Sequence, residues 1–298
     1  MDASTKSYRA VCFDLDGTLL AMDLDEFLAT YFKGIAMFMA AHGHDAEKFA
    51  MALGYGTKVM MAAHEAQTNE MAFWNAFLPL AGGTQEEWEP LFNEFYENEF
   101  GKIGANVQAV PAAAQAIATL CAKGYPVLCT TMPLFPRVAV NWRLRWAGVD
   151  DEVFARVTTY DNSTSVKPEL VYFAENLAAM GVTGDQILMV GNNTVEDGTF
   201  TKFGTDIFFV TDWLIDPVGR GVADYKHGSL DDFAKWVEGL PECADPLTDI
   251  EAGVVDRDAT LAMLATAEGV VSAADAKADS DYNNAAVARM ITTLKNEQ

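Results

Sequence analysis

The stretch VCFDLDGTLL, residues 11–20, ends an apolar run on two carboxylates, Asp14 and Asp16, that are two positions apart. Side chains at positions i and i+2 of an extended chain share a face, so both carboxylates can be directed toward one pocket as the chain leaves a strand. Open parallel sheets bind their ligands outside the carboxyl ends of their strands, which is where this pair falls. The alternative interpretation is that Asp-Leu-Asp-Gly forms only a polar turn.

The run before Asp14 is one of several short apolar runs that are rich in β-forming residues. They cover residues 8–14, 125–131, 154–160, 186–191 and 206–212. Continuous rather than alternating apolarity is typical of strands buried on both faces, as in a parallel sheet covered by helices. Helical patterns such as PAAAQAIATLCAKG and KPELVYFAENLAAMG lie between the runs. Strands that alternate with helices predict an α/β fold with a Rossmann-like, doubly wound parallel sheet.

The first two predicted strands are separated by far more residues than one crossover connection needs. The intervening segment indicates helices almost throughout, and Thr84 with Glu87 forms a capping-box pattern before one of them. The segment GSLDDFAKWVEGL predicts the last helix of the core. We therefore expect an α/β core at 1–21 and 109–241, an inserted α-helical cap at 22–108, and an acidic C-terminal helical extension or tail at 242–298.

Composition excludes several classes of partner. The chain has a formal net charge of −23, which argues against the broad electrostatic attraction that nucleic acids and anionic membranes require. An anionic substrate must then be held by local positive groups. No basic flank with a long apolar segment opens the sequence, and we expect a cytoplasmic protein. The sequence does not fix the oligomeric state.

Cysteines and histidines give only weak signals for metal binding. The cysteines lack CxxC spacing, so we expect reduced thiols at Cys12, Cys121, Cys129 and Cys243. His42 and His44 flank Gly43, and residues at i and i+2 do not share a helix face. Together with His64 they fall in the predicted cap, where an exposed helix end is the favoured interpretation over a metal site.

Chemically useful side chains also follow the second and third predicted strands. Thr130, Thr131 and Met132 follow the second strand, where a hydroxyl and free backbone N–H groups are expected to bind phosphate oxygens. Lys167 follows the third strand, just before Pro168, and can place its positive charge on a phosphate or on Asp14. Turn-forming threonines and a solvated lysine at a helix start are the alternatives.

The fourth predicted strand ends in MVGNNTVEDG, where a glycine allows a tight turn before several oxygen-bearing side chains. Amide and carboxylate oxygens are the ligands that hard cations prefer. The candidates are Asn192, Asn193, Glu196 and Asp197. Taken alone, the two acids also fit the first turn of a helix.

These four segments resemble the motifs of the haloacid dehalogenase superfamily of phosphohydrolases. The match consists of DLDGT at 14–18, a threonine that ends the second strand, Lys167 before a helix, and an acidic loop after MVG. The motifs occur in the family's order over about residues 8 to 215. The helical insertion after the first motif resembles the cap that closes over the site in part of this family.

The resemblance implies a Mg²⁺-dependent phosphatase that hydrolyses a small phosphorylated metabolite. Asp14 would be the nucleophile that forms an aspartyl-phosphate, and Asp16 would protonate the leaving oxygen and then activate water. Thr131, or Thr130 if the strand ends one residue earlier, would bind the phosphate, and Lys167 would orient Asp14. The resemblance implies Mg²⁺ ligands at Asp14, the backbone carbonyl of Asp16, Asn192 and Asp197.

Two departures from the family's pattern leave alternatives open. Met132 replaces a usual asparagine, and Asn192 with Asn193 replaces a usual aspartate-containing pair, which should weaken Mg²⁺ binding. A catalytically weak relative that binds a phosphorylated ligand or a protein partner is therefore the second hypothesis. A dehalogenase is disfavoured because a halide leaves without the proton that Asp16 would supply. Transfer of the phosphoryl group to an acceptor other than water stays open.

Overall fold

The computed structural model describes residues 6–62 and 67–267 and contains one six-stranded sheet, in which every pairing is parallel. The strand order is β3-β2-β1-β4-β5-β6. The strands are β1 Ala10–Phe13, β2 Val127–Cys129, β3 Phe154–Val157, β4 Ile187–Gly191, β5 Asp206–Val210 and β6 Lys226–Gly228. The chain runs outward from β1 to β3, then returns to the other side of β1 at β4. This reversal is the doubly wound arrangement predicted from the sequence.

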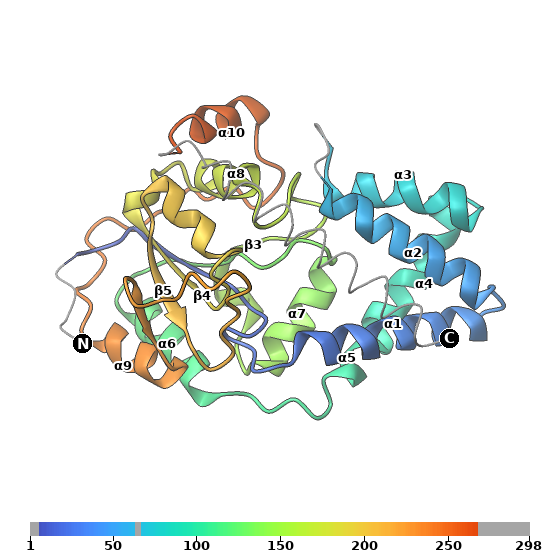
Figure 1. Ribbon diagram of the computed structural model, residues 1–298, viewed down its shortest axis with the longest axis horizontal. Helices are drawn as coiled ribbons and strands as arrows, with labels where there is room; N and C mark the ends of the chain where they lie inside the picture. The colour runs from blue at the N-terminus through green and yellow to red at the C-terminus, as the bar shows by residue number, and fades with distance from the viewer. Residues whose placement is uncertain (1–5, 63–66, 268–298) are drawn as a thin grey trace.

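Helices cover both faces of the sheet (Figure 1). The core helices are α6 Pro111–Ala122, α7 Arg137–Trp146, α8 Leu170–Met180 and α9 Leu230–Glu238, with 3₁₀ turns η1 Asp151–Val153, η2 Gly184–Gln186 and η3 Gly198–Phe203. Alternate residues of β1 face the two layers, since Val11 and Phe13 join the cluster that contains α6 and α9, whereas Ala10 and Cys12 join the cluster that contains α8. Burial on both faces explains the continuous apolarity of the strand sequences.

Between β1 and α6, the described residues form five helices, which lie beside the sheet (Figure 1). They are α1 Leu24–Ala41, α2 Ala46–Met61, α3 Asn69–Ala81, α4 Gln85–Asn98 and the short α5 Phe100–Ile103. The side chain of Glu87 accepts a hydrogen bond from the backbone N–H of Thr84, which is the expected capping box. His42 caps the C-terminus of α1, as expected for an exposed helix end, and His64 lies outside the described residues.

The cysteines are reduced, as expected from the sequence, whereas the outermost strand β6 was not expected. All four cysteines are unpaired thiols, and burial raises the pKa of both Cys12 and Cys129 to about 12. The strand β6 was not expected, because its sequence KHG is polar and mostly exposed. An edge strand needs only one paired side, so it can form without the apolar run that marks the central strands.

Asn69, at the start of α3, fastens the cap to the core. Its side chain is fully buried and donates hydrogen bonds to the backbone carbonyls of Pro133, at 3.0 Å, and Ser165, at 3.1 Å. Its backbone N–H donates to the carbonyl of Ser163. The two side-chain acceptors belong to the loops that carry Thr131 and Lys167. A single cap residue therefore joins two of the segments expected to form the site.

The C-terminal extension packs on the core at least as far as residue 267. Its helix α10, Arg257–Leu264, lies against α8 (Figure 1). Arg156 of β3 is almost fully buried, and its Nη1 donates to the carbonyls of Glu251, at 2.6 Å, and Gly253, at 2.8 Å. Of the two interpretations left open, a packed extension is correct for these residues, whereas residues 268–298 lie outside the described part.

We expect the Arg156→Met variant to lower the free energy of unfolding by about 3 kcal/mol, because two carbonyls would lose a charged donor. The melting temperature should fall by roughly 5 to 10 °C, and limited proteolysis should then cut first within residues 242–267. Arg137→Met is the matched control, since Arg137 is exposed. Unchanged melting and proteolysis of Arg156→Met would show that this contact does not hold the extension.

Candidate active site

Asp14 and Asp16 leave the end of β1 in a tight loop. The backbone N–H of Gly17 donates to the carbonyl of Leu20, and Gly17 has a φ of +79°. A Cβ atom at Gly17 would lie 2.2 Å from Nδ2 of Asn192, so only glycine lets these two loops approach. The hydroxyl of Thr18 donates to Oδ2 of Asp14, at 3.0 Å, and lies 3.3 Å from Oδ1 of Asn192. The loop thus brings the first and fourth motifs into contact.

Lys167 is fully buried between two carboxylates. Its Nζ donates to Oδ1 of Asp14, at 2.8 Å, and to Oδ1 of Asp197, at 2.6 Å. Burial lowers the pKa of Lys167, but the charges of Asp14 and Asp197 outweigh burial and hold its pKa well above the ordinary value. Lys167 therefore stays charged and fixes the orientation of the Asp14 carboxylate.

Asp197 has a different role from the metal ligand expected above. Its Oδ1 accepts from Lys167, and its Oδ2 accepts from the backbone N–H groups of Asn192, at 3.0 Å, and Asn193, at 2.9 Å. Its carboxyl packs so closely on Gly191 that a Cβ there would lie 2.3 Å away. Both oxygens are already engaged, so Asp197 holds Lys167 in place and shapes the loop after β4.

The threonines after β2 separate into two roles. The hydroxyl of Thr130 lies 3.3 Å from the carbonyl of Phe13 and 3.6 Å from the sulfur of Met189, so it faces the interior of the sheet. This corrects the expectation that Thr130 binds substrate. Thr131 and Met132 both line the cavity at Asp14, and the buried hydroxyl of Thr131 has no hydrogen-bond partner among the described residues. Thr131 is thus the threonine placed for a ligand.

Asn192 and Asn193 both line the same cavity, but their side chains are held differently. Nδ2 of Asn192 donates to the carbonyl of Trp213, at 2.6 Å, which turns its Oδ1 toward Thr18 and Asp14. Oδ1 of Asn193 accepts from the backbone N–H groups of Val195 and Glu196 and so stabilises the turn. Asn192 therefore supplies the better oxygen for a cation.

Asp16 has a partner that the sequence reading missed, Arg143 of α7. Nη1 of Arg143 forms a short ion pair with Oδ2 of Asp16, and the Arg143 side chain is only 1% exposed. Burial raises the pKa of Asp16, an effect that Arg143 opposes. A sequence signal exists, because Arg143 falls at helical spacing on the face of α7 that also buries Val140 and Leu144.

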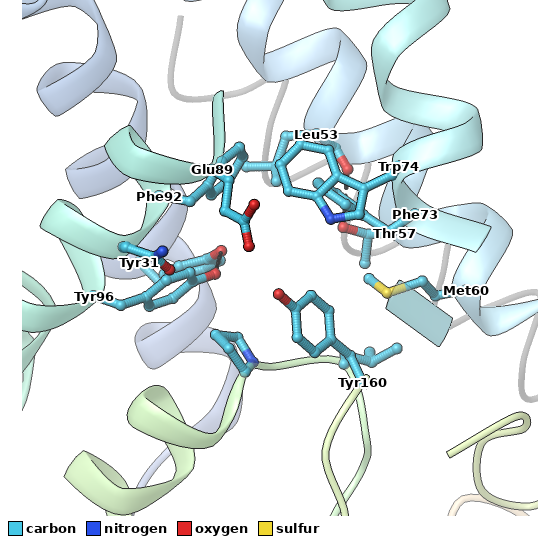
Figure 2. Close-up of a pocket in the computed structure, with 13 residues that line it drawn as sticks. Tyr31, Leu53, Thr57, Met60, Phe73, Trp74, Glu89, Phe92, Tyr96 and Tyr160 are labelled. Carbon is cyan, nitrogen blue, oxygen red and sulfur yellow. Dashed lines mark hydrogen bonds between the residues drawn. The ribbon is translucent and has the colours of Figure 1, made fainter. Parts of the chain in front are cut away.

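Both aspartates face a cavity of about 120 Å³ between the core and the cap. The core contributes the polar side chains of Asp14, Asp16, Thr131, Arg143, Asn192, Asn193 and Glu196. Lys167, which was expected to bind substrate, is fully buried behind Asp14 and does not line the cavity. The cap contributes a mainly apolar wall that includes Leu24, Phe27, Leu28 and Met61. A second cavity lies beyond Leu134, and Figure 2 shows Tyr160 and Glu89 pointing into it beneath Trp74.

The oxygen donors at the cavity fit a hard cation such as Mg²⁺. Asp14 and Asn192 place one carboxylate and one amide oxygen around the Thr18 hydroxyl, and Glu196 lines the same space. Within residues 6–62 and 67–267, no group of three or more His, Cys, Asp and Glu side chains is arranged to hold a metal ion. The oxygen donors at the cavity are therefore chemically suitable for a hard cation, and the carboxylates of Asp14, Asp16 and Glu196 give the lining negative charge.

Comparison with known proteins gives one family match and several similar solved structures. The family model of haloacid dehalogenase-like hydrolases matches residues 8–204. A similar solved structure is a HAD phosphatase from Thermococcus onnurineus, with 20% identity, a TM-score of 0.47 and coverage of 78% of this chain and 99% of that one. Another is the L-2-haloacid dehalogenase from Xanthobacter autotrophicus, with 15% identity, a TM-score of 0.46 and coverage of 78% and 99%.

No curated protein gives a significant match to the sequence. No helix in the described part of the chain is long and apolar enough to cross a membrane. The family match covers more than half of the chain and includes all four motif segments, from Asp14 to Asp197. The chain belongs to the haloacid dehalogenase-like hydrolases.

Proposed function

We propose that this hydrolase is a Mg²⁺-dependent phosphatase that acts on a small phosphorylated metabolite through an aspartyl-phosphate. The observation that carries the proposal is that Asp14 and Asp16 line one cavity but have different hydrogen-bond partners. Asp14 is fixed by Lys167, whereas Oδ1 of Asp16 has no hydrogen-bond partner among the described residues. One carboxylate is thus positioned to attack and the other has an oxygen left for proton transfer.

The chain's own groups account for each step of the hydrolysis. A carboxylate oxygen of Asp14 forms a bond to phosphorus while the bond to the leaving oxygen breaks, and Asp16 supplies the proton that this oxygen takes up. Asp16 then accepts a proton from the water that attacks the aspartyl-phosphate. Thr131 binds phosphate oxygens, and Lys167 acts through the Asp14 carboxylate that it orients. Bound Mg²⁺, held by Asp14, Asn192 and the Asp16 carbonyl, would neutralise charge on the phosphate.

The position of Asp16 supports a phosphatase over a dehalogenase. A halide needs no proton when it leaves, whereas an alkoxide does. The cap wall of the cavity, with Phe27, Leu28 and Met61, supports a leaving group with an apolar portion.

The test is hydrolysis of a panel of small phosphate esters, including p-nitrophenyl phosphate, with Mg²⁺ and with a chelator. We expect turnover with Mg²⁺ and its loss on chelation. A folded, metal-loaded protein that hydrolyses no member of the panel would contradict the proposal. Product analysis with added alcohols separates hydrolysis from phosphotransfer.

Asn192 favours a second candidate function, a catalytically weak protein that binds a phosphorylated ligand. We expect Asn192→Asp to bind Mg²⁺ at least about tenfold more tightly, because a unit charge a few ångströms from the ion contributes several kcal/mol even at an effective dielectric constant of about 20. The measurement is the Mg²⁺ dependence of melting temperature and of turnover.

Asn193→Asp is the matched control, because its side chain is engaged by the turn at Val195 and Glu196. A large gain in both Mg²⁺ affinity and rate, specific to Asn192→Asp, would support a weakened site in the natural chain. No gain in rate would support a site already adapted to asparagine.

A further inference from the structure

Arg143 is a buried cation with few of its hydrogen-bonding demands met. Its Nη1 contacts Oδ2 of Asp16, and the face of its guanidinium lies over the ring of Phe135, with Cζ 4.7 Å from the ring centroid. Its Nε and Nη2 are buried and have no hydrogen-bond partner among residues 6–62 and 67–267. Only one charged contact therefore accompanies the burial of this guanidinium.

An arginine that serves stability alone is expected to satisfy most of its five N–H donors. A buried donor that has no partner loses its hydrogen bonds to water without replacement, which destabilises the folded state. The chain offers a direct contrast in Arg156, which is equally buried but donates through Nε, Nη1 and Nη2. Arg143 therefore leaves two buried donors without partners, whereas Arg156 leaves none of its nitrogen atoms without one. The one charged contact that Arg143 makes is with Asp16.

We propose that Arg143 is a positioning residue that holds Asp16 by Oδ2 and leaves Oδ1 as the oxygen that exchanges protons with substrate. This inference rests on the proposed phosphatase function. Nη1 of Arg143 already faces Oδ2 as a donor, so a proton on the Asp16 carboxyl belongs on Oδ1. The ring of Phe135 limits rotation of the guanidinium, and helix α7 fixes the base of the side chain.

This arrangement defines the atoms of the first step. As a carboxylate oxygen of Asp14 bonds to phosphorus and the bond from phosphorus to the leaving oxygen breaks, the proton on Oδ1 of Asp16 passes to that oxygen. In the second step a proton from water returns to Oδ1 as the acyl phosphate is cleaved. Arg143 lines the same cavity and neither gains nor loses a proton in these steps.

The test compares two substrates whose leaving groups differ in their need for a proton. p-Nitrophenolate leaves without protonation, whereas the alkoxide of a simple alkyl phosphate requires it. In Arg143→Met, the ratio of kcat/KM for the alkyl ester to that for p-nitrophenyl phosphate should fall at least about tenfold, because general acid catalysis contributes factors of about 10² to 10⁴. A purely structural role would slow both substrates equally.

Three further variants sharpen the comparison. Asp16→Asn should show the same bias between substrates, and adding Arg143→Met to it should produce no further bias. Arg143→Lys should recover part of the ratio, and it replaces Arg143→Met if that variant does not fold. Arg145→Gln is the control on the same helix, because Arg145 is exposed and pairs with Asp151.

A crystal structure of Arg143→Met gives a readout that does not depend on turnover. We expect the Asp16 carboxylate to rotate away from its native position. An unmoved carboxylate, or an unchanged ratio between substrates, would overturn the role of Arg143. Absence of turnover in the natural chain would instead overturn the proposed phosphatase function, and the position of Asp16 in the variant would still decide the role of Arg143.

Discussion

Asp14→Asn is expected to reduce hydrolysis of p-nitrophenyl phosphate by at least about 10³-fold, because an amide oxygen is a far poorer nucleophile than a carboxylate. The substitution keeps the size of the side chain, and its Oδ1 can still accept from Lys167 while its Nδ2 donates to the Thr18 hydroxyl, which reverses the native bond there. The loss should therefore appear in kcat, with little change in the fold. Steady-state kinetics together with trapping of the phosphoenzyme by rapid acid quench measures it.

Asp25→Asn is the matched control for the nucleophile, since Asp25 lines the same cavity from the cap but is exposed. It should retain most of the activity, and the phosphoenzyme should form at the natural level. Turnover by Asp14→Asn close to that of the natural chain would mean that another group attacks phosphorus.

Lys167→Met should damage both stability and activity. It would leave the carboxylates of Asp14 and Asp197 buried side by side without the cation that separates them. Removing one partner from a buried ion pair typically costs about 3 to 5 kcal/mol. The melting temperature should fall by roughly 10 °C, and turnover should fall by at least about 10²-fold because Asp14 would lose its orientation.

Thermal denaturation and kinetics on the same preparations measure both effects. Lys102→Met serves as the control, because Lys102 pairs with Glu99 at the exposed surface. A gain in stability on acidification of Lys167→Met would fit protonation of one of the two carboxylates. If its melting temperature matched that of Lys102→Met, the buried ion pairs would not contribute to stability.

The central sheet and three of the motif segments could be predicted because their signals lie within short, continuous stretches of sequence. Strands buried on both faces have continuous apolar sequences, and the carboxyl ends of β1, β2 and β4 then converge at one edge of the sheet. Strand β6 escaped prediction because an exposed edge strand needs no apolar run. The choice between Thr130 and Thr131 required the register, since one residue reverses the direction of a strand side chain.

The roles of Asp197 and Arg143 depend on contacts between distant segments. Nothing near Asp197 in the sequence shows that its two oxygens are engaged by Lys167 and by backbone N–H groups. Arg143 lies far along the chain from Asp16 and belongs to no motif recognised in the sequence. A charged residue on the apolar face of a helix predicts a buried partner elsewhere in the fold, because burial of a guanidinium requires a compensating contact.

The contacts of Asn69 limit how the cap can move. A lid joined to its base only by the two chain connections, near residues 20–24 and 103–111, would be free to turn about the line between them. The side-chain bonds from Asn69 to Pro133 and Ser165 add further attachments, as does the bond from Nε1 of Trp142 in α7 to the carbonyl of Tyr96 in α4. Opening of the whole cap must then break these bonds, and their rupture would pull on the loops that carry Thr131 and Lys167. Admission of substrate and assembly of the catalytic groups would in that way be one motion.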